Sequence, residues 1–240
     1  MTTPYISIIS SAIHTQFWME IYNQFNCSLN KVPFELVFVG NKTPNFQLPP
    51  NFIFIYSDAK PAKCFEIAAR NAHGEYMMFF QDDLIIPDRA LNWICAYIPR
   101  LPEQKKLVLT PRFSDTPNGE PRDNLLSFYP PYIGSPVIGV GTIFHRQLWY
   151  ELGGIDRRFN LLFSDYDMML RIYEQGGIPF IVPECVLKER SHEGRNRLIN
   201  NYKPDRELLY SLWLLPDKTV SKKRLQSLQP YTKEEIVIVR

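Results

Sequence analysis

Two adjacent carboxylates, Asp82 and Asp83, follow a glutamine and the apolar run Tyr76–Phe80. Two like charges at the end of a buried strand cannot easily neutralise one another, and their hard oxygen atoms suit Mg²⁺ or Mn²⁺. A cation of this kind shares its remaining coordination positions with substrate phosphates. The same pair also fits a solvated turn that ends the strand, and the two residues alone favour neither interpretation.

A second group of acids lies at the predicted start of a helix. Ser164 can cap this helix, and Asp167, three residues later, gives a capping-box-like pattern with Asp in place of Glu. Asp165 falls in the first turn, where the helix dipole favours the ionised carboxylate that a general base requires. On its own, this pattern indicates a helix start and no more.

The basic stretch Lys188–Arg197 surrounds one histidine, His192. A neutral imidazole can bind a metal, and arginine side chains can hold phosphate oxygens. A charged loop with a single histidine is also typical of a plain solvated surface. This stretch alone therefore does not distinguish a binding site from a solvated surface.

The elements that must position these groups alternate along the chain. Apolar, β-branched or aromatic runs predict strands at Tyr5–Ser11, Glu35–Asn41, Phe52–Ser57, Tyr76–Phe80, Leu107–Thr110, Val137–Phe144 and Ile178–Val182. Helical spacing predicts helices at His14–Cys27, Pro61–His73, Leu91–Ile98, Arg146–Leu152, Ser164–Tyr173 and Arg206–Leu215. This alternation favours a parallel sheet covered on both faces. Ligands bind beyond the carboxyl ends of such strands, which is where Asp82 and Asp83 stand.

Two segments carry little periodicity. Pro111–Pro136 contains six prolines and is too long for a mere connector, so we expect a loop that shapes a binding surface. The charged tail from Pro216 is the other. Substrate choice is expected to depend on these two segments.

Composition limits the classes of function. The chain has 240 residues, enough for one large α/β domain, and its net charge of +2 gives no bulk field that would favour nucleic acid. Its four cysteines lie far apart and are interpreted as free thiols in a reducing cytoplasm. The N-terminal residues lack a signal-peptide pattern, and no apolar run approaches the ~20 residues that span a bilayer. We expect a cytoplasmic protein, either soluble or peripheral to the inner face of the membrane.

A membrane contact stays open because of the predicted last helix. Trp213 and its neighbouring leucines could form an apolar face near the basic residues Lys218, Lys222 and Lys223. The alternative is a C-terminal helix that packs on the core.

Three stretches together resemble one family. Residues 68–83, AARNAHGEYMMFFQDD, are similar to the "ARN-x-G…GEY-apolar-D-x-D" signature of glycosyltransferase family 2, which has the GT-A fold. Residues 151–159 and 163–171 resemble that family's "GGFDE-x-F…ED-x-D-x-x-LR", and His192–Arg195 resembles its C-terminal histidine loop. The match covers about residues 5–200, in order and at suitable spacings.

The resemblance implies the architecture. It predicts a GT-A, Rossmann-like α/β fold with a mostly parallel central sheet flanked by helices on both faces. Residues 1–215 would form this domain, with a nucleotide-binding half at 1–100 and an acceptor and catalytic half at 101–215. Residues 216–240 would be a C-terminal tail.

The resemblance also implies roles. Asp83 would bind the divalent cation, Mn²⁺ or Mg²⁺, and Asp82 would assist through the ribose or the metal. Asp165 would be the general base that takes the proton of the acceptor hydroxyl, while Asp167 caps the helix or orients the site. His192 would contact the metal or the diphosphate.

Nucleotide contacts are assigned to Ser10, Asn41 and Arg70. Arg70 equally fits a helix-surface ion pair. Asn41 follows Gly40 where the family usually has an acid that holds the nucleotide base, which leaves the identity of the base open. Ser10 and Ser11 replace the usual Pro-Thr or Pro-Ala, Gln81 replaces a common Asp, and Ser164 replaces the Glu beside the expected base.

These residues predict an inverting glycosyltransferase that moves a sugar from a nucleotide diphosphate sugar to a saccharide or other hydroxyl acceptor. A sugar nucleotidyltransferase would need a Gly-rich basic loop after the first strand, where this chain reads Ser-Ser-Ala-Ile-His. The other alternative, motivated by the departures, is a catalytically degenerate GT-A domain that binds a glycan or a partner.

Overall fold

Short buried runs pair into one mixed sheet in the computed structural model, which describes residues 3–27, 31–100, 107–123, 140–190, 203–213 and 227–236. Within these ranges eight strands pair in the order β3-β2-β1-β4-β7-β6-β8-β5. Their bounds are β1 Ile6–Ser11, β2 Phe34–Gly40, β3 Phe52–Tyr56, β4 Tyr76–Gln81, β5 Leu84–Ile85, β6 Leu107–Ser114, β7 Ile143–His145 and β8 Ile178–Glu189.

The first four strands of this order run parallel. β1 pairs in parallel with β2 and β4, and β2 pairs in parallel with β3. β7 lies antiparallel to both β4 and β6, and β8 runs parallel to β6. The sheet is therefore mostly parallel on one side and mixed on the other. The near-continuous apolar character of β2 and β4 follows because both faces of these strands are covered.

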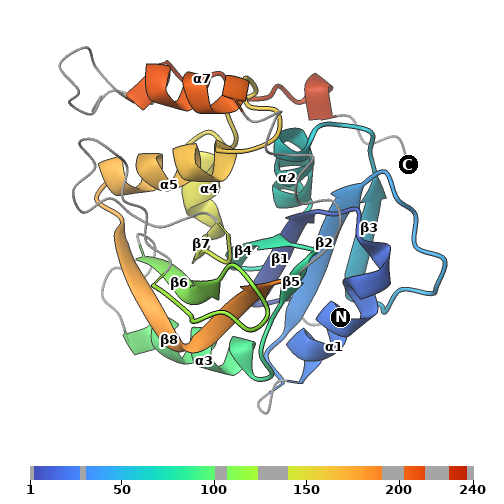
Figure 1. Ribbon diagram of the computed structural model, residues 1–240. Helices are drawn as coiled ribbons and strands as arrows, with labels where there is room; N and C mark the ends of the chain where they lie inside the picture. Colours follow the sequence, from blue (N-terminus) through green and yellow to red (C-terminus); the bar gives the residue numbers. More distant parts are fainter. Residues whose placement is uncertain are drawn as a thin grey trace.

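Helices cover the two faces of the sheet (Figure 1). A 3₁₀ turn η1 (Thr15–Phe17), α1 (Trp18–Asn26) and α3 (Ala90–Tyr97) lie on one face, and α2 (Pro61–Arg70), α4 (Arg146–Glu151), α5 (Ser164–Glu174) and α7 (Lys203–Trp213) on the other. Alternate residues of each strand enter opposite cores: Val37 and Val39 pack with α2, whereas Leu36 and Phe38 pack with α1. This two-residue period places apolar side chains in both layers.

The sheet curls so that its far edge returns to its centre. β4 is the fourth strand of the order and β5 is the last, yet only Asp82 and Asp83 separate them in the chain. The two acids consequently lie where the curled sheet folds back on itself, as the short β5 beside β8 shows in Figure 1.

The predicted fold class, an α/β sheet with helices on both faces, is confirmed. Strand bounds on the second side differ from expectation. β8 does not end at Val182 but continues to Glu189, so Lys188 belongs to a strand rather than to a basic loop. β6 likewise runs to Ser114, beyond the predicted end at Thr110. A register shift between Pro111 and Arg112 lets both strands continue past their prolines.

A buried ion pair ties the helices of one face together. Asp167 and Arg171 of α5 are both 0% exposed and contact each other at 3.0 Å. The Arg171 guanidinium also donates to the carbonyl oxygens of Leu152 and Gly154 after α4. Asp167 accepts a 2.9 Å hydrogen bond from the Trp213 indole of α7. One buried pair therefore joins α4, α5 and α7.

The C-terminal part packs on this face. Leu209 and Trp213 of α7 are 0% exposed and belong to the core, so packing on the core, and not a free apolar face, accounts for these two residues. Residues 227–236 also return to the domain, where Ile236 joins the same core. Within the ranges that the structure describes, no helix has both the length and the apolar character needed to cross a membrane.

We predict that Arg171→Met lowers the free energy of unfolding by about 3–5 kcal/mol, because it leaves the Asp167 carboxylate buried without its counter-charge. Urea unfolding followed by circular dichroism measures this loss.

Lys203→Met is the matched control, since Lys203 and Glu207 form an i,i+4 pair whose side chains are 71% and 63% exposed. It should change stability by less than about 0.5 kcal/mol. Equal effects of the two substitutions would contradict a structural role for the buried pair.

Candidate active site

Asp82 is a buried anchor at the carboxyl end of β4. The residue is 3% exposed, and its Oδ2 accepts hydrogen bonds from the backbone N–H groups of Ile13 and His14 and from the Trp18 indole, at 2.6, 2.5 and 2.9 Å. Its Oδ1 lies 2.9 Å from His14 Nδ1. These contacts fasten the β1–α1 connection to β4.

The contact with Asp82 stabilises the protonated form of His14. Its hydrogen bond to Asp82 raises the imidazole pKa above the ordinary value, burial opposes this, and the charges of Asp82 and Asp83 add to the rise. His14 and Trp18 belong to no motif and were not predicted from the sequence. Their signal was positional, because both follow β1, whose carboxyl end adjoins that of β4 through the pairing of Ser11 with Gln81.

Asp83 occupies the next position and is partly exposed. Its backbone oxygen accepts a 2.9 Å hydrogen bond from the N–H group of Arg190, the residue that follows β8. Leu84 pairs with Glu189, and Lys188 pairs with both Ile85 and Ser114. Asp83 therefore lies where the carboxyl ends of β4, β6 and β8 meet.

Asp165 lies in the first turn of α5, as predicted. It is only partly exposed, and burial of its carboxyl group raises its pKa to about 6, against the hydrogen bond that Oδ1 accepts from the Tyr166 N–H at 2.9 Å. Burial thus outweighs the helix-start effect that favours the ionised form. A carboxylate with a pKa near the working pH is suited to general base catalysis.

The start of α5 is fixed by the residues before it. Phe163 has a φ of 65°, an unusual conformation for a bulky side chain, and its ring packs against that of Tyr166 at 5.2 Å. Just upstream, the Asp205 carboxylate of α7 accepts from three successive backbone N–H groups, those of Asn160, Leu161 and Leu162. Such a strained, firmly held entry is common beside functional groups.

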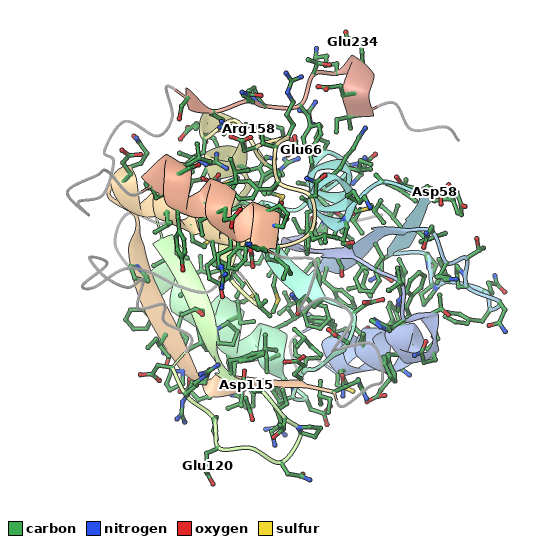
Figure 2. All side chains as sticks on the ribbon, turned by 45° about the horizontal axis from the view of Figure 1, so that its top comes forward. Asp58, Glu66, Asp115, Glu120, Arg158 and Glu234 are labelled. Carbon is green, nitrogen blue, oxygen red and sulfur yellow. The ribbon has the colours of Figure 1, made fainter. Side chains whose placement is uncertain are left out.

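The turn after β6 relates the segment of Asp83 to the start of α5. It carries Asp115 and Arg122, with Glu120 at its outer tip (Figure 2). Burial raises the pKa of Tyr166, Asp115 raises it further and Arg122 lowers it, so the charges of this turn act on the residue that follows Asp165. Lys188 pairs with Ser114 at the end of β6 and with Ile85 in the segment that follows Asp83.

The nucleotide contacts expected from the sequence fall in different environments. Ser10 is 0% exposed, and its hydroxyl donates to the Ser11 carbonyl, which leaves it inside β1. Asn41 is exposed just beyond β2. Arg70 forms the i,i+4 ion pair that was its alternative, at 2.7 Å from Glu66, and also donates to the Tyr231 carbonyl. His192 lies outside the described residues.

The Asp83 carboxylate fits a cation that takes its other ligands from phosphate oxygens. Among the described residues no cluster of three potential ligands occurs. Mg²⁺ and similar ions are held by one or two carboxylates together with phosphate oxygens, so a partly exposed Asp83 at the rim meets this need without a complete protein cage. Asp82, with its four hydrogen-bond contacts, is not required for it.

Two cavities lie at the opposite end of the strands. Their volumes are about 770 and 950 Å³, and both are lined by Thr3, Pro4, Pro33 and His73. These residues precede β1, β2 and β4, whereas ligands of parallel sheets bind beyond the carboxyl ends. The cavities therefore lie at the other end of the strands from Asp83.

Comparison with known proteins places the fold. No family model and no curated protein matches the sequence. Residues 1–349 of S. aureus TarS, solved with UDP-GlcNAc, align with a TM-score of 0.62 and 16% identity over 86% of this chain and 66% of that one. GalNAc-T7, solved with UDP, GalNAc and Mn²⁺, aligns with a TM-score of 0.64 and 12% identity over 89% of this chain and 48% of that one.

Both are glycosyltransferases with GT-A-like folds, and the curled sheet of this protein has the same architecture. The chain spans about two thirds of the TarS fragment and about half of GalNAc-T7.

We predict that Asp165→Asn stabilises the fold at pH 8. The carboxyl pKa of about 6 in the folded protein exceeds the unfolded value of 3.8, so the wild type loses stability as pH rises between these values. Asparagine cannot ionise and avoids this loss. The variant should gain about 1–3 kcal/mol in free energy of unfolding at pH 8.

Urea titrations from pH 3.5 to 8 measure the difference, which should vanish below about pH 4. A gain that is independent of pH would show that the Asp165 carboxyl is not the titrating group.

Proposed function

We propose that this protein is a glycosyltransferase of the family 2 type, which moves a sugar from a nucleotide diphosphate sugar to an acceptor hydroxyl with inversion at the anomeric carbon. The observation that carries the proposal is a GT-A-like sheet in which Asp83 follows the carboxyl end of β4 and Asp165 lies in the first turn of α5. The bound ligands of the two similar structures, UDP-GlcNAc in one and UDP with Mn²⁺ in the other, support a donor of this class.

Asp83 would hold a divalent cation, Mn²⁺ or Mg²⁺, against the donor diphosphate. When bound, such a cation supplies Lewis-acid stabilisation of the negative charge on the leaving group. Asn41, exposed beyond β2, is suited to contact the nucleotide. Lys188, near the carboxyl end of β8, is a basic residue that pairs with Ile85 of the strand that follows Asp83.

Asp165 would act on the acceptor. The acceptor oxygen forms a bond to the anomeric carbon while the bond from that carbon to the diphosphate oxygen breaks, and the nucleoside diphosphate leaves with the electron pair. The acceptor proton passes to the Asp165 carboxylate. Attack from the side opposite the leaving group inverts the configuration of the sugar.

The first prediction from this proposal concerns donor binding. UDP should bind more tightly with Mn²⁺ than without it, and Asp83→Asn should weaken the Mn²⁺-dependent affinity about a hundredfold because it removes a ligand of the cation. Calorimetry with UDP, with and without Mn²⁺, measures both effects.

Asp88→Asn is the matched control, since Asp88 is exposed five residues further along the chain and should bind UDP like the wild type. If UDP and GDP both fail to bind the wild type with Mn²⁺, the transferase proposal is wrong. Binding that is indifferent to the metal, with no turnover, would favour the degenerate, ligand-binding domain instead.

The second prediction concerns pH. Because the base must be ionised, the rate of UDP release from UDP-GlcNAc should fall about tenfold per pH unit below the Asp165 pKa of about 6 and level off above it. Asp165→Asn should lower the rate constant by about 10²–10⁴-fold while UDP affinity is kept.

Asp88→Asn, the exposed control used for UDP binding, serves again as the comparison and should keep the wild-type rate and pH profile. A pH profile of Asp165→Asn that keeps the wild-type shape would remove Asp165 from the role of base.

A further inference from the structure

Arg190 contacts three separate parts of the rim. Its backbone N–H donates to the Asp83 carbonyl at 2.9 Å. Its guanidinium carbon lies 4.5 Å from the centroid of the Phe17 ring, and its Nη2 lies 2.6 Å from Glu20 Oε1. The side chain is only 14% exposed. A planar guanidinium is suited to stacking on an aromatic ring while it pairs with a carboxylate.

These contacts close a ring around Asp83. The neighbouring Asp82 holds residues 13–18 through Ile13, His14 and Trp18. The same segment continues into Phe17 and Glu20, which hold the Arg190 side chain, and the Arg190 backbone returns to Asp83. The peptide between Asp82 and Asp83 is thus fixed from both sides. Neither set of contacts involves the Asp83 carboxylate.

The ring also determines where the chain goes after β8. Pairing of Leu84 with Glu189 brings the end of β8 beside Asp83, and Arg190 pins that end to η1 and α1. Because the two strands pair over only two residues, the side chain of Arg190 is a substantial part of the connection.

We propose that Arg190 is a positioning residue for the cation held by Asp83: it acts through the backbone of Asp83 and fastens the end of β8 to the β1–α1 connection. This inference rests on the proposed function, since it assigns Arg190 to the same donor site. Partners that orient a metal ligand without touching the metal commonly change metal affinity by about 10–100-fold when they are removed.

The test is the Mn²⁺ concentration that half-saturates UDP binding, measured by calorimetry on the full chain. Arg190→Gln should raise this concentration about tenfold, whereas UDP affinity without metal should stay within about twofold of the wild type. Arg190→Lys should lie between them, because lysine keeps the charge near Glu20 but loses the planar stacking on Phe17. Glu20→Gln should shift the concentration in the same direction by a smaller factor.

Arg157→Gln is the matched control. Arg157 and Glu235 form a surface ion pair at 3.1 Å, beside the pairing of Asp156 with Pro230 that holds the C-terminal segment. This variant should leave the Mn²⁺ concentration unchanged. The melting temperature of Arg157→Gln should stay close to that of the wild type, because exposed ion pairs add little stability. Circular dichroism of all four variants checks that each is folded.

The outcomes separate the two proposals. If the wild type shows Mn²⁺-dependent UDP binding and Arg190→Gln and Arg190→Lys keep its half-saturating concentration, the positioning role is refuted while the transferase proposal stands. If Arg190→Gln weakens UDP binding equally with and without Mn²⁺, Arg190 contacts the nucleotide and the inference is also wrong. If the wild type binds no UDP under either condition, both proposals fail together.

Discussion

The buried pair of Asp167 and Arg171 is the interaction on which the second half of the protein depends. Burying two charges is unfavourable unless both are paired and their remaining groups are hydrogen bonded. Here the guanidinium donors reach the turn after α4, and the carboxylate reaches the Trp213 indole of α7. Glu66 extends the arrangement into α2 by accepting from the Ile155 N–H at 2.8 Å. A side chain at Gly154 would collide with that carboxylate, because an added Cβ would lie 2.5 Å from Glu66 Oε2.

In each of two acidic pairs, Asp82 with Asp83 and Asp165 with Asp167, one side chain is buried and the other is partly exposed. Asp82 and Asp167 are buried and accept several hydrogen bonds, whereas Asp83 and Asp165 are partly exposed. The buried acid fixes the backbone from which the exposed acid projects. This division matters for chemistry because a metal ligand or a base is effective only when its position is set before the substrate arrives. The buried acids stabilise the fold, and the partly exposed acids are the two that we propose for the site.

Apolar runs and helical spacing along the sequence were sufficient to predict the strands and helices that depend on neighbouring residues. The apolar runs of β1, β2 and β4 and the helical spacing of α2 and α5 predicted both the layers and the rim that holds Asp83. Long-range pairing was not readable in the same way. The extension of β8 to Glu189 depends on β6 beside it, and the role of Asp82 depends on donors near residue 14, about 70 positions away. Likewise, the raised pKa of Asp165 reflects its surroundings, which the helix-start pattern does not contain.

The missing acid after β2 has a packing explanation. A Cβ at Gly40 would collide with the carbonyl oxygen of Ala12, because the end of β2 runs against the β1–α1 connection that Asp82 holds in place. The Ala12 N–H donates to the Val39 carbonyl at 2.8 Å, which fixes this close approach. Any side chain at position 40 is therefore incompatible with this backbone. Asn41 is the first exposed residue beyond β2, which is why the proposed nucleotide contact is assigned to it and not to position 40.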